Sequence, residues 1–225
     1  MLKTPIIIVN FKTYKEATGD NAIKLAKICN KLAKETKTSI AVAVQSTDIY
    51  RISKIVSIPV LSQHVDAISF GKNTGFLLPE SVKQAGAEAT LLNHSEHRLD
   101  FDLLKKSIER AKQAGLKTVV CANNTKATEK IANLNPDFIA IEPPEFIGTK
   151  ISISEASPEI ITGSVNSIKS INNKIKVICG AGIHNAKDIR RSIELGADGV
   201  LVASVIKRAK NKKEELKKLV SGFVK

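Results

Sequence analysis

The stretch Pro5–Lys12 reads PIIIVNFK. Its apolar run is continuous rather than alternating, which is typical of a strand buried on both faces of a parallel sheet. The run ends in Asn10, Phe11 and Lys12, and no glycine follows before Gly19. A doubly wound open sheet that binds a dinucleotide would carry a glycine-rich turn at this point. The stretch therefore argues against an open sheet and favours another parallel architecture.

Further apolar runs of the same kind follow along the chain, and longer segments separate them. These runs are Ser39–Val44, Ile58–Leu61, Thr90–Asn93, Lys117–Cys121, Phe138–Glu142, Lys176–Gly180 and Gly199–Val202. Dividing the 225 residues by eight gives roughly 28 per unit, close to the roughly 30 that a βαβ unit needs. The sequence predicts an α/β protein, a single-domain (β/α)8 TIM barrel over residues 1–225, with a doubly wound open sheet as the alternative.

The segments between the runs have the spacing of amphipathic helices. Leu104, Ile108 and Ala111 recur at steps of four and three, which places them on one helix face. The same spacing recurs in Ala186, Ile189 and Ile193.

Helix ends are indicated by local residue types. Ser157 before Pro158 predicts a helix start with a capping hydroxyl, and Asn185 predicts a second cap. Gly115 and Gly196 are placed where two of these helices should end.

The charge balance limits the classes of partner. Lysine and arginine number 35 against 22 acidic residues, a net charge of +13. Such an excess suits nucleic acid, an acidic membrane surface or an anionic small substrate. Aromatic residues make up only 4% and tryptophan is absent, which argues against stacking platforms for nucleic acid. No apolar run approaches the length of a membrane span. We therefore expect a small anion rather than nucleic acid or a membrane.

The cysteines indicate a reducing compartment. Cys29, Cys121 and Cys179 lie far apart, and the chain opens with no secretory signal. An odd number of widely spaced cysteines is typical of free thiols in the cytosol. We expect a cytoplasmic protein.

Reactive side chains lie at the C-terminal ends of several predicted strands, where barrel enzymes carry their chemistry. Glu142 could abstract a proton, and His94 could donate to a carbonyl oxygen or shuttle a proton. Lys12 could stabilise negative charge as it develops. Each residue alone has an ordinary structural interpretation, as a salt-bridge partner or a packed histidine. Their shared position favours proton abstraction beside a carbonyl, which needs no metal and no organic cofactor.

Several segments resemble the triosephosphate isomerase family. Val9–Lys12 (VNFK) resembles its first-strand Asn-x-Lys signature, and Leu92–Arg98 (LNHSEHR) resembles its His-Ser-Glu segment. Ile141–Thr149 (IEPPEFIGT) resembles the base and lid, and Gly71–Gly75 (GKNTG) resembles the tip of the third loop. The short length and the Pro-Pro-Glu lid are similar to the archaeal branch.

The resemblance implies an aldose–ketose isomerase of glycolysis and gluconeogenesis, which interconverts dihydroxyacetone phosphate and D-glyceraldehyde 3-phosphate through an enediol(ate). Glu142 would be the base, His94 the neutral electrophile and Lys12 the electrostatic stabiliser, without cofactor or metal. The implied substrate-binding residues are Asn10, Lys12, Ile147, Gly148, Gly182, Ala203 and Ser204. Glu96 would support Lys12, and Thr74 would touch a partner's site.

The resemblance and the third loop together indicate an oligomer. Gln63–Gly75 is long for a βα connection and carries Val65, Ile68 and Phe70, which are costly to expose. We expect a homo-oligomer, a tetramer rather than a dimer. The alternative is a loop folded over its own barrel mouth.

Some positions depart from the family pattern. The stretch Cys179–Gly182 lacks the serine that many members place on the phosphate. Lys150 stands where a lid glycine is common, and Ala203 and Ser204 stand where a glycine pair is common. The nearest alternative function is another phosphate-binding barrel, from amino-acid or thiamine biosynthesis. Such a barrel would suit the small residues at strand seven equally well, but not Lys12, His94 and Glu142 together.

Overall fold

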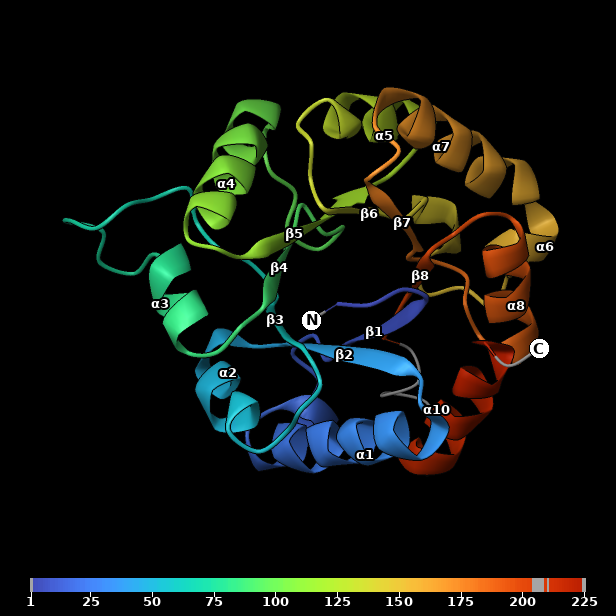
Figure 1. Cartoon of the computed structure of the whole chain (residues 1–225), viewed down its shortest axis with the longest axis horizontal. Coiled ribbons are helices and arrows are strands. Elements are labelled where there is room, and N and C mark those ends of the chain that lie inside the picture. The colour runs from blue at the N-terminus through green and yellow to red at the C-terminus, as the bar shows by residue number, and fades with distance from the viewer. Residues whose placement is uncertain (1, 204–208, 210, 224–225) are drawn as a thin grey trace.

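The computed structural model describes residues 2–203, 209 and 211–223. In this part of the chain eight parallel strands close into a barrel in sequence order (Figure 1). They are β1 Ile6–Asn10, β2 Ser39–Val44, β3 Val60–Ser62, β4 Ala89–Leu92, β5 Lys117–Ala122, β6 Phe138–Ile141, β7 Lys176–Cys179 and β8 Gly199–Val202. The predicted barrel is confirmed, and the open sheet is wrong because β8 pairs with β1.

Helices surround the barrel and cover its outer face (Figure 1). The α-helices are α1 Asp20–Thr36, α2 Ser46–Ser53, α3 Pro79–Gln84, α4 Phe101–Gln113, α5 Thr125–Ala132, α6 Ile153–Ala156, α7 Pro158–Ile171, α8 Ala186–Glu194 and α10 Lys212–Val220. Short 3₁₀ helices are η1 Lys15–Ala17, η2 Pro144–Phe146 and η3 Ser221–Phe223. Among the described residues, no helix has the length and apolar character needed to cross a bilayer.

The continuous apolar runs supply two concentric cores. Ile6 and Ile8 of β1 pack inside the barrel together with Leu91 of β4. Ile7 and Val9, which alternate with them, belong to the outer core between barrel and helices. Because successive side chains of a strand point to opposite faces, a strand in such a barrel is apolar at every position.

The predicted helix faces are buried. Leu104, Ile108 and Ala111 of α4 are each at most 2% exposed. On α8, Ile189 is fully buried and Ile193 packs against the outer core. The helical spacing read from the sequence therefore identified the correct faces.

Three of the four predicted helix ends have the expected local cause. Asn185 caps α8 by accepting hydrogen bonds from backbone amides, and Asp188 completes a capping box. Gly115 and Gly196 follow α4 and α8 with φ of 77° and 96°, a left-handed conformation that glycine adopts without strain.

The predicted hydroxyl cap at Ser157 is wrong. α7 does begin at Pro158, but the Ser157 side chain makes no capping hydrogen bond. Ser157 also ends α6, where its backbone amide donates to the Ile153 carbonyl oxygen. Two helices meet at this one residue, and its backbone (φ −149°, ψ 60°) serves the end of the first helix rather than the start of the second.

The third loop, residues 63–78, projects away from the barrel between α3 and α4 (Figure 1). The alternative of a loop folded over its own barrel mouth is therefore wrong. Val65, one of the loop residues that would be costly to expose, is fully buried in the outer core. Phe70 and Phe76 are the exposed apolar side chains, at 71% and 60%.

The base of this loop is fixed by hydrogen bonds. The Asp66 amide donates to the Leu77 carbonyl oxygen at 3.0 Å, and the Leu77 amide donates to the Asp66 carboxylate at 2.6 Å. Arg110 of α4 donates from Nε to the Ile68 carbonyl oxygen at 2.7 Å and from Nη2 to Glu80 of α3 at 2.5 Å. Arg110 thus bonds the loop to α4 and also links α4 to α3, whereas the tip of the loop is exposed.

Candidate active site

A cavity of about 530 Å³ opens at the C-terminal ends of the strands. Its lining includes nearly all of the predicted site residues: Asn10, Lys12, His94, Glu96, Glu142, Ile147, Gly148, Gly182 and Ala203. Thr74 lies elsewhere, exposed at the tip of the third loop. Ser204 lies outside the described residues. The residues that the positional rule selected at the strand ends therefore line one cavity.

Lys12 follows β1 and has a left-handed backbone with φ of 48°. Such a conformation costs a non-glycine residue on the order of 1 kcal/mol and persists only where neighbours hold it. The Lys12 amide donates to Asn10 Oδ1 at 3.0 Å, and Gln63 Nε2 donates to the Lys12 carbonyl oxygen at 2.9 Å. These bonds direct the side chain to the cavity, where Nζ lies 2.7 Å from Glu96 Oε1.

One backbone contact determines which ring nitrogen of neutral His94 carries the proton. The Glu96 amide donates to His94 Nδ1 at 3.1 Å. An amide nitrogen can only donate, so Nδ1 must accept and a neutral ring carries its proton on Nε2. Because His94 is only 9% exposed, the ring presents this Nε2 proton to the cavity as a fixed donor.

Glu142 faces that donor from the opposite side. Its Oε1 lies 3.4 Å from His94 Nε2, and its side chain is 4% exposed. Its Oε2 is buried and accepts no hydrogen bond from any residue that the structure describes. Burial raises the pKa of the Cys121 thiol well above its usual range, and the nearby Glu142 carboxylate raises it further. Glu142 is thus a buried carboxylate with one oxygen available to accept a proton.

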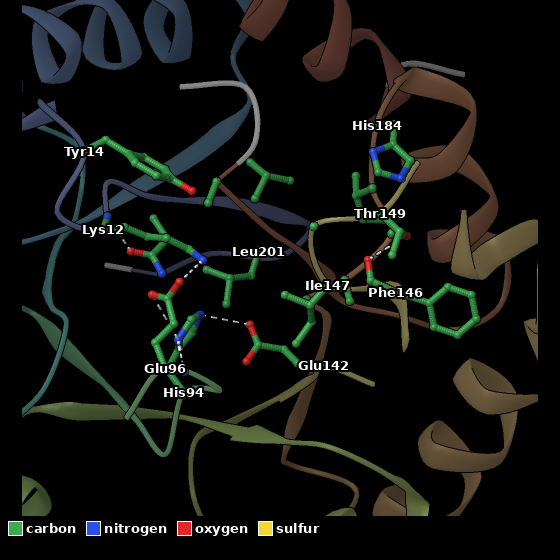
Figure 2. A pocket seen from close by; sticks show the side chains of 18 residues that line it. Lys12, Tyr14, His94, Glu96, Glu142, Phe146, Ile147, Thr149, His184 and Leu201 are labelled. Carbon is green, nitrogen blue, oxygen red and sulfur yellow. Dashed lines mark hydrogen bonds and ion pairs between the residues drawn. The ribbon is translucent and has the colours of Figure 1, made fainter. Parts of the chain in front are cut away.

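Figure 2 shows how these groups converge: Lys12 points to Glu96, and His94 lies between Glu96 and Glu142. A cation, a neutral hydrogen-bond donor and a carboxylate base therefore surround one cavity. Such a set can remove a proton next to a carbonyl group, donate a hydrogen bond to the carbonyl oxygen and stabilise the resulting negative charge.

Two glycines after β7 are required by close contacts. A Cβ at Gly180 would meet Glu142 Cγ at 2.6 Å. A Cβ at Gly182 would meet the Ile153 amide nitrogen at 2.6 Å and the Ile151 carbonyl oxygen at 2.9 Å, and its φ is +63°. A side chain at position 182 would therefore collide with the backbone that follows η2.

The sequence did not indicate that Gln63 supports Lys12 or that Gly180 leaves space for Glu142. It also did not indicate that Tyr14 and His184 line the cavity. None of them lies in a periodic pattern, and only a resemblance or a known contact could have singled them out. No group of three or more His, Cys, Asp or Glu side chains within the described ranges is placed to hold a metal ion.

Comparison with known proteins is consistent across sequence and structure. The family model for triosephosphate isomerase matches residues 5–222. A triosephosphate isomerase from Methanobacterium bryantii is 51% identical over 219 residues, which cover 97% of each chain. One from Methanothermobacter thermautotrophicus is 48% identical over 218 residues, covering 97% of this chain and 95% of the relative.

A solved structure shares the fold. The crystal structure of triosephosphate isomerase from Bartonella henselae superposes with a TM-score of 0.80 at 18% identity, covering 99% of this chain and 100% of that one. At this identity the likeness supports the barrel architecture alone.

Proposed function

The chain belongs to the triosephosphate isomerase family and is an isomerase, and from this we propose how its own residues perform the reaction. The proposed reaction interconverts dihydroxyacetone phosphate and D-glyceraldehyde 3-phosphate through an enediolate. The observation that carries the assignment is the pairing of Glu142 Oε1 with His94 Nε2 at 3.4 Å in a cavity that Lys12 also lines.

Glu142 acts as the base in this proposal. It removes a proton from the carbon beside the substrate carbonyl and returns it to the neighbouring carbon. Its burial at 4% exposure supports this role, because a carboxylate that water does not solvate needs little solvent reorganisation when it accepts a proton.

His94 and Lys12 stabilise the enediolate in this proposal. His94 Nε2 donates a hydrogen bond to the substrate oxygen that becomes negative, which the Nδ1 contact with the Glu96 amide supports. The same ring relays the hydroxyl proton from one substrate oxygen to the other, so that the carbonyl group and the hydroxyl group exchange places. Lys12 places a positive charge near the same oxygen and the phosphate, and Glu96 orients the ammonium group. Fixed donors and charges of this kind are among the largest contributions to such reactions.

The phosphate group would rest on backbone amides of Gly148, Gly182, Ala203 and Ser204. Small residues allow a ligand to approach the backbone closely, as phosphate sites after barrel strands seven and eight commonly require. Asn10 and Ile147 would complete the substrate-binding wall, and their place in the cavity lining supports this.

Residues 143–150 would form a lid over the bound substrate. The segment follows the base directly and carries Ile147 and Gly148 into the cavity wall. Closure would exclude water and protect the enediolate, whose phosphate could otherwise be lost.

We also propose an oligomeric state and a cellular location for the protein. Residues 1–225 form one catalytic domain that acts as a homo-oligomer, a tetramer rather than a dimer, with Thr74 reaching the site of a partner. The exposed Phe70 and Phe76 on the projecting loop support association. Three free buried cysteines support a cytoplasmic location, and the reaction would serve glycolysis and gluconeogenesis.

The test is isomerase turnover of purified wild-type protein and a Glu142→Gln variant. We expect the variant to fold and to lose on the order of 10²- to 10⁴-fold in kcat, as removal of a general base typically costs. Glu159→Gln, an exposed change on α7, should keep wild-type kcat. A Glu142→Gln variant with near wild-type turnover would show that the base is misassigned.

A further inference from the structure

His184 lies two residues beyond Gly182 in the loop between β7 and α8, and its backbone is held firmly. The His184 amide donates to Asp188 Oδ2 at 2.8 Å. Asp188 is 1% exposed and belongs to the capping box of α8. The position of His184 is therefore set by the start of α8.

The ring of His184 reaches across to the end of the proposed lid. Nε2 lies 3.2 Å from the carbonyl oxygen of Ile151, the first residue after the lid segment 143–150. A carbonyl oxygen only accepts, so Nε2 must carry the proton in this contact. The other ring nitrogen, Nδ1, is buried and has no hydrogen-bond partner among the described residues. A donor proton there would be unsatisfied, which also favours the Nε2 form.

A second contact joins the same two segments. The backbone around Gly182 packs so closely against Ile151 and Ile153 that a Cβ at Gly182 would lie 2.6 Å from the Ile153 amide nitrogen. Figure 2 shows His184 beside Thr149, at the far side of the cavity from His94 and Glu96. The lid thus begins at the base, Glu142, and ends against the loop that carries Gly182 and His184.

We propose that His184 is a positioning residue that fastens the C-terminal end of the lid at Ile151. The inference rests on the proposed function of residues 143–150 as a lid. The hydrogen bond holds the end of the lid at a fixed distance from Gly182, so that Gly148 and Gly182 approach the same phosphate when the lid closes. His184 then acts on phosphate retention rather than on proton transfer.

Loss of this bond should let phosphate escape from the intermediate. In that side reaction the electron pair of the enediolate forms a new carbon–carbon double bond while the carbon–oxygen bond to phosphate breaks. The bonding electrons leave with inorganic phosphate, and no oxidant or reductant is needed. Released phosphate per isomerisation event therefore reports how well the lid is fastened.

The test compares three substitutions at one position. His184→Ala removes the donor, His184→Gln places an amide NH₂ near the position of Nε2, and His184→Asn places it near Nδ1, too short to reach Ile151. We expect the Ala and Asn variants to raise KM, and the inhibition constant of 2-phosphoglycolate, by about 2- to 10-fold, the effect of one net hydrogen bond. Both should release more phosphate per turnover, and Gln should restore wild-type values.

A readout without turnover separates this inference from the proposed function. Amide hydrogen exchange in the segment 150–153 of the ligand-free protein should be faster in the Ala and Asn variants and normal in Gln. Arg190→Ala, an exposed change on α8, controls for general loosening of that helix. Equal exchange and equal KM in wild type and His184→Ala would overturn the anchor, as would a Gln variant that behaves like Ala. A wild-type protein without isomerase turnover would instead refute the proposed function, while the exchange result would still decide the anchor.

Discussion

At the scale of single residues, the position of Glu142 depends on the lack of a side chain at Gly180. Gly180 has no side chain, and this leaves room for the Glu142 carboxylate between β6 and β7. The backbone of Gly180 is not in the left-handed region, so close approach rather than φ explains the glycine. The position of the base is thus set from the neighbouring strand.

A methyl group at Gly180 should displace the base without breaking the fold. A Cβ there would lie 2.6 Å from Glu142 Cγ, so the carboxylate must move. A misplacement of about 1 Å can cost on the order of 10²-fold in rate, and we expect kcat of Gly180→Ala to fall by about that factor. Steady-state kinetics measure the loss of kcat, and circular dichroism checks that the fold is retained.

Gly163→Ala is the matched control. Gly163 lies within α7 and has no atom within 4 Å of an added Cβ. Its substitution should leave kcat unchanged and stabilise the protein by roughly 0.5–1 kcal/mol, the usual gain of alanine over glycine in a helix. Wild-type kcat in Gly180→Ala would contradict the packing argument.

At the scale of elements, one side chain, Arg110, joins α3, α4 and the third loop. The Arg110 guanidinium holds the pKa of the Glu80 carboxyl below its usual range by hydrogen bonding. The same guanidinium binds the Ile68 carbonyl oxygen at the loop base. Stability in this region should therefore depend on pH.

The direction of that dependence follows from proton binding. The unfolded carboxyl has a pKa near 4.3, above that of the folded protein, so the unfolded state binds more protons as pH falls. The contribution of Glu80 is complete above about pH 5 and is lost as pH falls through the lowered pKa of the folded state. Glu80→Gln should therefore be less stable than wild type at pH 7 and should approach it in acid.

Urea midpoints measured between pH 7 and pH 3 test this expectation. Glu35→Gln, which removes the exposed pair of Glu35 with Lys31 at 3.7 Å, should change the midpoint little at any pH. If the difference in urea midpoint between Glu80→Gln and wild type stayed constant from pH 7 to pH 3, the lowered pKa of the Glu80 carboxyl would be contradicted.

At the scale of the whole molecule, the barrel was predictable because its strands are apolar at every position. Runs such as Pro5–Asn10 remain apolar since both faces of each strand are covered. The bounds of β3 were displaced by one to two residues, because Pro59 and Ser62 at its edges carry no strong strand signal. Composition and spacing were enough to predict the fold, whereas the first and last residues of each strand depend on local hydrogen bonds.

The candidate site was predictable in part, for a different reason. Lys12, His94 and Glu142 follow strands, where barrel chemistry lies, so a positional rule found them together. Gln63 and His184 act through contacts between segments distant in the sequence. The sequence did not indicate what would bury Val65, which turns inward from the loop and joins the outer core of its own chain.

The exposed tip of the third loop predicts the assembly state. Phe70 and Phe76 are 71% and 60% exposed, and a partner would cover them. We expect wild-type protein to sediment as an oligomer, with a tetramer favoured. The double variant Phe70→Asp with Phe76→Asp should form smaller, less active species, while Ile171→Asp on α7 should not. A fully active wild-type monomer would refute the assembly, and a stable dimer would refute only the tetramer.

If Glu142 moves a proton between two carbons of the substrate, turnover in deuterated water should label the product. A proton held by a carboxylate exchanges with solvent, so D-glyceraldehyde 3-phosphate formed from dihydroxyacetone phosphate should contain deuterium at C2. Magnetic resonance of the product should detect this deuterium with wild type, and Glu142→Gln should form labelled product at least about 100-fold more slowly. Unlabelled product from wild type, or equally fast labelling by Glu142→Gln, would contradict the account.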